Sequence, residues 1–167
     1  MKKIVALVLA LVLVLTAVSA LAAPSPQKPK KKTTGVTEKA GEIELQDVQD
    51  TDGTKAIKEQ IKKDADAGNA LASVTVELPE GFTKVSEMAT VKFPAGAKNL
   101  KFKKMFQTPY AAGTTVEVLF GIPGNPVEWL MVTGVANAAG EVVFTLSEAV
   151  YNKIVGKEVV MIPVTKA

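Results

Sequence analysis

The side chains that most often carry out catalysis are missing from this sequence. Its 167 residues include no histidine, no cysteine and no arginine. The first two absences exclude Ser-His-Asp hydrolysis, thiolate chemistry and the usual zinc ligands. The third removes the planar guanidinium that favours phosphate and carboxylate recognition. An enzyme would have to use a pair of carboxylates, as in glycoside hydrolysis, or a serine activated by a lysine.

The serines and acids that remain form no recognisable catalytic motif. Ser147 is expected to cap a helix, Ser73 begins an expected strand, and no partner motif surrounds Ser86 and Glu87. The other carboxylates are scattered over the expected strands and helices, where solubility explains them. We therefore expect a protein that is not an enzyme, and a hydrolase with paired carboxylates is the weaker alternative.

Three acids near the start of the expected domain suggest a calcium site. Asp50, Asp52 and Glu59 fall at positions 3, 5 and 12 of an EF-hand loop. Position 1 is then Val48, which has no ligating side chain. The competing interpretation is that Asp52 or Thr54 caps the following helix. Calcium is the only cofactor that the sequence suggests, and the missing first ligand counts against it.

Three aromatic side chains are candidates for a ligand platform. They are Trp129, the only tryptophan, and the two tyrosines Tyr110 and Tyr151. Aromatic rings exposed on a β-sandwich would suit sugar binding, whereas a tryptophan on an apolar strand is equally suited to the core. A carbohydrate-binding module that uses exposed aromatics is therefore one alternative for the function.

The first 22 residues have the features of a cleaved secretion signal. Lys2 and Lys3 precede an apolar run, and Ala20-Leu21-Ala22 is a small-x-small cleavage site. A membrane span needs a longer run, of roughly 20 apolar residues. We expect cleavage after Ala22, no transmembrane anchor afterwards, and a secreted or extracellular protein whose association with the cell surface stays open.

Residues 23–41 are expected to form a disordered tail rich in proline and lysine. The tail holds five lysines and one acid, whereas residues 42–167 hold 13 lysines and 16 acids. Because the positive charge lies on a tail and not on a domain face, nucleic-acid binding is not expected. The tail is either a spacer or a contact with anionic lipids or wall polymers through Lys28, Lys30, Lys31 and Lys32.

The clearest element of the expected domain, residues 42–167, is a hairpin of Thr115–Gly121 and Val127–Val132. Apolar residues on both faces of its first strand indicate a strand that is covered on both sides. Two prolines and a glycine within residues 122–126 predict the turn. Alternation and turn residues predict further strands at 42–48, 73–78, 89–93, 100–106, 142–146 and 158–164, and helices at 55–67 and 147–155.

Short strands separated by frequent turns predict a mainly β fold. We expect an antiparallel immunoglobulin-like β-sandwich with one N-terminal helix and one short helix before the last strand. An open α+β sheet is the alternative. The expected function is a secreted, non-catalytic binding or surface-accessory domain whose partner is an unknown protein or a cell-surface polymer, with a protein favoured. The sequence does not indicate the oligomeric state.

Residues 71–164 contain a set of short strand-and-turn patterns. They are Leu78-Pro-Glu-Gly81, Thr108-Pro-Tyr110, Gly113 to Gly121, Val127-Glu-Trp129 and Gly140-x-Val142-x-Phe144. In these patterns the chain resembles uncharacterised small secreted β-domain proteins of anaerobic Gram-positive bacteria. The resemblance implies bacterial secretion and a β domain, and it brings no site residues with it.

Overall fold

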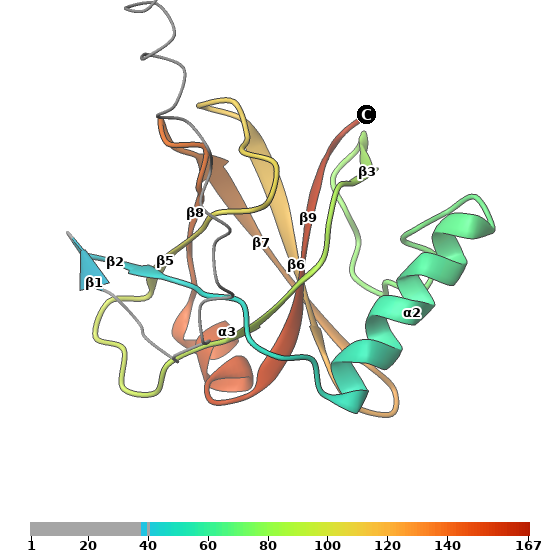
Figure 1. Ribbon diagram of the computed structural model, residues 1–167, viewed down its shortest axis with the longest axis horizontal. Coiled ribbons are helices and arrows are strands. Elements are labelled where there is room, and N and C mark those ends of the chain that lie inside the picture. Colours follow the sequence, from blue (N-terminus) through green and yellow to red (C-terminus); the bar gives the residue numbers. More distant parts are fainter. Residues whose placement is uncertain (1–37, 40) are drawn as a thin grey trace, which may run out of the picture. The chain divides into compact units, whose positions relative to one another are not determined.

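The computed structural model describes residues 38–39 and 41–167 (Figure 1). The expected signal and most of the expected tail, including Lys28, Lys30, Lys31 and Lys32, lie outside the described residues. Within the described part, nine strands form one mixed sheet, accompanied by two helices. No helix of this part is long and apolar enough to cross a membrane.

The strands lie in the order β1-β2-β5-β8-β7-β6-β9-β3, and β4 also pairs with β9. Only β2 and β5 run parallel among the described pairs. The mainly β prediction is confirmed, but an immunoglobulin-like antiparallel sandwich is not, because these strands form a single mixed sheet. The elements are β1 Glu38–Lys39, β2 Glu42–Glu44, α2 Asp52–Asp66, β3 Phe82–Val85, β4 Ala89–Lys92, β5 Lys101–Lys104, β6 Thr115–Ile122, β7 Glu128–Ala136, β8 Val142–Thr145, α3 Glu148–Ile154 and β9 Glu158–Lys166.

The predicted hairpin is present as β6 and β7. These strands pair in continuous antiparallel register from Thr115–Val135 to Ile122–Glu128. On its other side β6 pairs with β9. A strand in this position is flanked by strands on both edges and covered on both faces, which explains why apolar residues occupy both of its phases.

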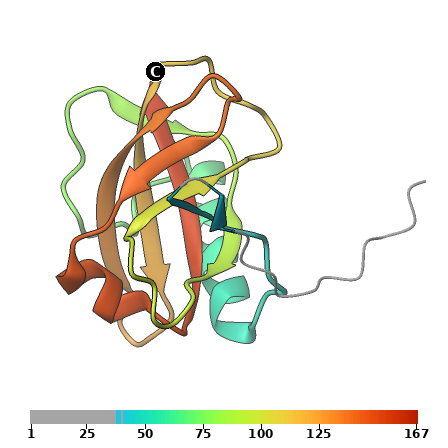
Figure 2. The ribbon, with the colours of Figure 1, turned by 90° about the vertical axis from the view of Figure 1, so that its left-hand side faces the viewer.

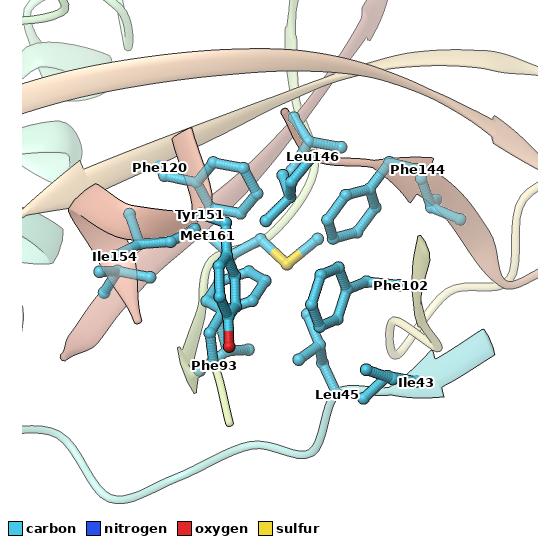
Figure 3. Close-up of a cluster of buried hydrophobic side chains, with 14 of the residues drawn as sticks. Ile43, Leu45, Phe93, Phe102, Phe120, Phe144, Leu146, Tyr151, Ile154 and Met161 are labelled. Carbon is cyan, nitrogen blue, oxygen red and sulfur yellow. The ribbon is translucent and has the colours of Figure 1, made fainter. Parts of the chain in front are cut away.

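One face of the curved sheet encloses what we call the inner cluster. Its aromatic centre is Phe93, whose ring meets those of Phe102 and Phe120 edge-on at centroid distances of 4.9 and 5.5 Å. Figure 3 shows the Met161 side chain among these rings. An isolated bridge between Asp47 and Val91 joins the segment after β2 to β4. The buried members are Ile43, Leu45, Val91, Phe93, Phe102, Phe106, Val116, Val118, Phe120, Ile122, Val142, Phe144, Leu146, Tyr151, Ile154, Val159 and Met161.

The other face of β6 and β9 carries the outer cluster, which α2 covers (Figures 1 and 2). Ile57 and Ile61, one helical turn apart, are the buried residues of α2 in this cluster. The irregular segment of residues 71–78 adds partly buried apolar side chains. The buried members are Ile57, Ile61, Phe82, Leu119, Trp129, Val160, Ile162 and Val164.

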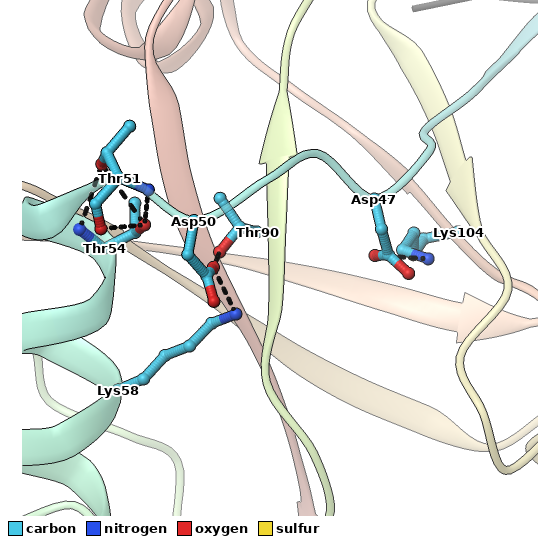
Figure 4. A network of polar contacts seen from close by, with 7 residues as sticks. All are labelled: Asp47, Asp50, Thr51, Thr54, Lys58, Thr90 and Lys104. Carbon is cyan, nitrogen blue, oxygen red and sulfur yellow. Dashed lines mark hydrogen bonds and ion pairs between the residues drawn. The ribbon is translucent and has the colours of Figure 1, made fainter. Parts of the chain in front are cut away.

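Helix α2 begins at Asp52 and not at Lys55 as predicted. Its cap is Thr51, whose hydroxyl accepts from the Thr54 amide at 3.3 Å, while the Thr54 hydroxyl accepts from the Thr51 amide at 2.9 Å (Figure 4). The prediction that Asp52 or Thr54 caps this helix is therefore wrong. The two threonine hydroxyls satisfy each other's backbone amides, so the helix gains a first turn before the apolar stripe starts.

The strand predicted at 73–78 is absent from the structure. Val74, Val76 and Leu78 do alternate, but their side chains pack against the outer cluster without any pairing of the segment in a sheet. Alternation reports which side chains are buried, and it does not by itself report strand pairing. The neighbouring edge strand is instead β3, which pairs with β9.

Two residues of types common at sheet edges lie in the interior of the sheet. Lys104 breaks the apolar alternation of residues 100–106, a pattern typical of an edge or a bulge, yet β5 lies between β2 and β8, and Lys104 is buried. Pro163 of β9 pairs with Val118 of β6, so β9 is not an edge strand. On the other side of β9 the pairing with β4 ends at Met161 and that with β3 starts at Val164. Pro163 thus occupies the gap between these two partners, where a missing N–H costs no ladder hydrogen bond.

Candidate functional site

Two of the three candidate aromatic residues are buried. Trp129 keeps 6% of its surface exposed and belongs to the outer cluster, where its ring packs over Gly121. A Cβ at Gly121 would lie 3.0 Å from this ring, so a larger residue there would require the ring to shift. Tyr151 belongs to the inner cluster, and its hydroxyl donates to the Pro94 carbonyl oxygen at 2.5 Å. Neither ring is exposed as a sugar platform would require, and Trp129 occupies the core position that was the competing interpretation.

Tyr110 is half-buried, and unlike Trp129 and Tyr151 it makes a side-chain hydrogen bond with an exposed residue. Its hydroxyl lies 2.6 Å from the hydroxyl oxygen of Ser86, an exposed residue. Its ring packs edge-on against Phe106 at a centroid distance of 5.9 Å. Burial raises the pKa of the Tyr110 phenol, the Ser86 hydrogen bond opposes that rise, and the charge of Glu87 adds to it. The pair presents a neutral hydroxyl donor and acceptor at neutral pH.

Glu87 lies next to this pair and fixes the chain opposite it. Its Oε2 accepts from the Gln107 backbone N–H at 3.1 Å. Its Oε1 is buried and has no hydrogen-bond partner among the described residues. No local pattern connects Ser86 or Glu87 with Tyr110, because Ser86 and Tyr110 lie 24 residues apart in the sequence. The intervening strands β4 and β5 each pair with other strands of the sheet, and the fold as a whole brings these side chains together.

We call residues 105–113 the Tyr110 loop. The buried ring of Phe106 anchors it from below, and the Tyr110 amide donates to the Gly140 carbonyl oxygen at 3.2 Å. Gly140 has a φ of 82°, and a Cβ there would lie 2.6 Å from the Cβ of Pro109. Both observations require a glycine at this contact. The loop is therefore held at several points, while Met105 within it is exposed.

The three acids considered for calcium do not converge. Asp50 accepts from the Lys58 ammonium at 2.7 Å and from the Thr90 hydroxyl, which ties α2 to β4 (Figure 4). Asp52 and Glu59 are exposed. Within residues 38–39 and 41–167 there is no group of three or more acidic, histidine or cysteine side chains placed to hold a metal ion. The structure gives Asp50 a structural contact in place of the role considered from the sequence.

A buried carboxylate that sequence reasoning missed lies on β6. Glu117 is 3% exposed, and its two oxygens accept from the Thr133 hydroxyl at 3.0 and 3.2 Å. A charged residue that alternates with Val116 and Val118 would face solvent if only one side of the strand were covered. Both faces of β6 are covered, so neither side of this strand faces solvent.

A second buried charged side chain is Lys104, at the end of β5. The Lys104 ammonium donates to the Met105 carbonyl oxygen at 2.7 Å and lies 3.2 Å from an Asp47 carboxylate oxygen. It also lies 5.6 Å from the centre of the Phe106 ring. These contacts hold the start of the Tyr110 loop against the segment that follows β2.

The fold and these contacts define a mainly β domain with a braced surface loop. Comparisons with protein-family models, with curated proteins and with solved structures find no match. The resemblance to small secreted bacterial proteins therefore stays a prediction.

Proposed function

We propose that this chain is an exported, non-catalytic binding domain, and that it binds a partner protein through the Tyr110 loop. The charged start, the short apolar run and the Ala20-Leu21-Ala22 pattern support export. The absence of histidine, cysteine and arginine from the sequence supports binding over catalysis.

The observation that carries the proposed site is the braced loop, which contains both an exposed Met105 and a half-buried Tyr110. Methionine and tyrosine are enriched in protein interfaces, where a ring supplies apolar area and its hydroxyl supplies a hydrogen bond. The contacts of Tyr110 with Ser86 and Gly140 hold the loop before binding. A loop that is already ordered loses less conformational entropy when a partner binds.

Sugar binding is the second candidate, and one observation favours it. Tyr110 retains a partly exposed ring next to two hydroxyl groups, its own and that of Ser86. A single ring is a smaller platform than the three-residue set expected from the sequence. The protein partner is preferred because the same loop also carries Met105, an exposed apolar side chain that would contribute little to binding a polyol.

The test places a photo-crosslinking amino acid at position 105 in the exported protein and, as the matched control, at the exposed position Asn152 of α3. We expect one protein of the cell surface to crosslink from position 105 and not from position 152. With that protein purified, Tyr110→Ala should weaken binding at least about 10-fold, the effect of a hot-spot residue. Melting temperatures of the variants verify that the fold is intact.

Three results would contradict the proposal. Equal crosslinking from both positions would remove the loop from the interface. Retention on a glycan array that Tyr110→Ala abolishes would favour sugar binding. Substrate turnover that disappears when one carboxylate is changed would show an enzyme. The intact mass of the exported protein tests the first step, because cleavage after Ala22 leaves Ala23 at the N-terminus.

A further inference from the structure

Strand β7 has a partner along its whole length on one side only. It pairs with β6 from Glu128 to Val135, but with β8 only from Gly134 to Ala136. Figure 1 shows β7 and the chain that leaves β8 separating beyond this point, as the latter runs toward α3. Residues 129–133 of β7 therefore form an edge without a neighbouring strand among the described residues, which we call the open edge.

The phase of the hydrogen bonds shows which backbone groups face the open edge. The Ala136 amide donates to the Thr114 carbonyl oxygen, on the β6 side, and the Asn137 amide donates to the Glu141 carbonyl oxygen, on the β8 side. Successive residues of a strand in an antiparallel pair direct their amides and carbonyls to opposite sides. Thr133, Met131 and Trp129 therefore direct theirs away from β6.

These outward groups are not used by other parts of the described chain. No turn, loop or side chain of the described residues hydrogen-bonds to the backbone of Trp129 or Met131, and the β8 ladder ends at Gly134. Donors and acceptors that recur at every second residue match the backbone of an extended polypeptide. A sugar or a lipid headgroup has no such repeat.

The flanks of the open edge favour a single strand as its occupant. At one end β8 crosses close to Gly134, where a Cβ would lie 2.7 Å from a Val142 methyl group. At the other end the Lys153 ammonium of α3 lies 2.5 Å from the Glu128 carboxylate. A strand needs a spacing of only about 4.8 Å from its neighbour, whereas the edge of a second folded copy would bring its own β8 and α3 against these flanks.

The side chains of β7 add apolar surface to the open edge. Leu130, Met131 and Val132 are partly exposed, and Val135 is 48% exposed. Other sheet edges are less receptive. Edge strand β3 has a register shift between Phe82 and Lys84, and Pro163 occupies the short gap that β3 and β4 leave along β9. Irregular pairing, lysine and proline all disfavour addition of a strand.

We propose that the open edge of β7 binds an extended, partly apolar segment of a partner protein as an added strand. This site is separate from the Tyr110 loop and rests on different observations, so either proposal can fail without the other. The added strand would supply hydrogen bonds to the backbone of Trp129 and Met131 and to the Thr133 amide, and would place apolar side chains beside Leu130 or Val132.

The probe is a phage-displayed library of linear heptapeptides, selected on the purified full-length exported protein. We expect enriched peptides that alternate apolar and polar residues. Backbone amide exchange is then followed by NMR with the synthetic peptide at tenfold its Kd. Exchange at Met131 and Thr133 should slow about 10-fold, as expected for occupancy of the site, while Val132, which is already bonded to β6, should change little. The control is the same peptide N-methylated at consecutive residues, which should not bind.

A variant provides a second, independent measurement. Met131→Pro removes an amide that faces the open edge and leaves the ladder to β6 without a lost donor. It should abolish peptide binding, whereas Met105→Ala should not affect it. If Met131→Pro does not fold, the exchange data on the unaltered protein still decide.

Absence of any enriched linear peptide, or protection of amides elsewhere, would overturn the proposal. Protection of Met131 that rises with protein concentration in the absence of peptide would also overturn it, since it would show that a second copy is the occupant.

Discussion

The inner and outer clusters share strands β6 and β9 but are covered in different ways. Strands and α3 surround the inner cluster, and five of its side chains are aromatic rings in mutual contact. The outer cluster is mainly aliphatic, and α2 and the irregular segment of residues 71–78 cover it. Residues in paired strands are coupled by the hydrogen bonds of the ladder and move together. A helix and a loop that cover a cluster can instead shift and repack.

This difference predicts that equivalent losses of volume cost more in the inner cluster. It also predicts where the protein opens first. The cover of the outer cluster has few ladder hydrogen bonds, so it should exchange its amides through local openings, whereas the strands around the inner cluster should exchange only on global unfolding.

The largest effect is expected for Phe120→Ala. The Phe120 ring is fully buried and contacts the Phe93 and Phe144 rings at centroid distances of 5.5 and 5.8 Å. Emptying this site should cost about 3–5 kcal/mol of unfolding free energy, because the surrounding strands cannot collapse into the cavity. Denaturant titration measures the loss, and Phe120→Leu is the control that keeps most of the volume and should cost less. A cost below that of a single methyl deletion would show that the inner cluster is loosely packed.

A smaller effect is expected for Ile61→Ala in the outer cluster. Ile61 is 1% exposed and packs from α2 against this cluster. Its loss should cost about 2–5 kcal/mol, toward the lower end because the helix and residues 71–78 can adjust. The exposed Glu59→Ala on the same helix should stay within about 0.5 kcal/mol. If Ile61→Ala costs more than Phe120→Ala in the same titration, the proposed difference between the two covers is wrong.

The sequence predicted the inner cluster better than the outer one, for a physical reason. The strands of the inner cluster alternate, and the hairpin, most strands and the short helix capped by Ser147 are present as predicted. Val74, Val76 and Leu78 alternate in the same way but pack without pairing. Local periodicity reports burial, and whether a buried segment also joins a sheet depends on partners distant in sequence.

The candidate site was less predictable than the fold. Tyr110 was identified as a ligand-binding candidate, yet its contacts with Ser86 and Gly140 join segments that are distant in the sequence. The exposure of Trp129 could not be decided from its type, because a tryptophan suits a core and a surface equally well. The apolar residues on both faces of β6 predicted a strand covered on both sides, but no local pattern indicated that Glu117 would be buried there with the Thr133 hydroxyl as its partner.

The smallest effect concerns the polar contact that closes the cover of the outer cluster. Near the end of α2, the Asp64 carboxylate accepts from the Ser73 amide at 3.0 Å, from the Ser73 hydroxyl, and from Gln60 at 2.8 Å. The Ser73 hydroxyl is the main cause that holds the pKa of Asp64 below its ordinary value of 3.8, and burial opposes it. A carboxyl group whose pKa is lower in the folded than in the unfolded state stabilises the folded state at pH values above its unfolded-state pKa. The stabilisation disappears as pH falls through the folded value.

Below about pH 4 the Ser73 amide should therefore exchange faster, after correction for the intrinsic rate, while amides of β6 stay protected. Asp64→Asn should remove this pH dependence. If Ser73 and β6 lose protection together on acidification, the outer cover does not open separately, and the contrast between the two clusters is wrong.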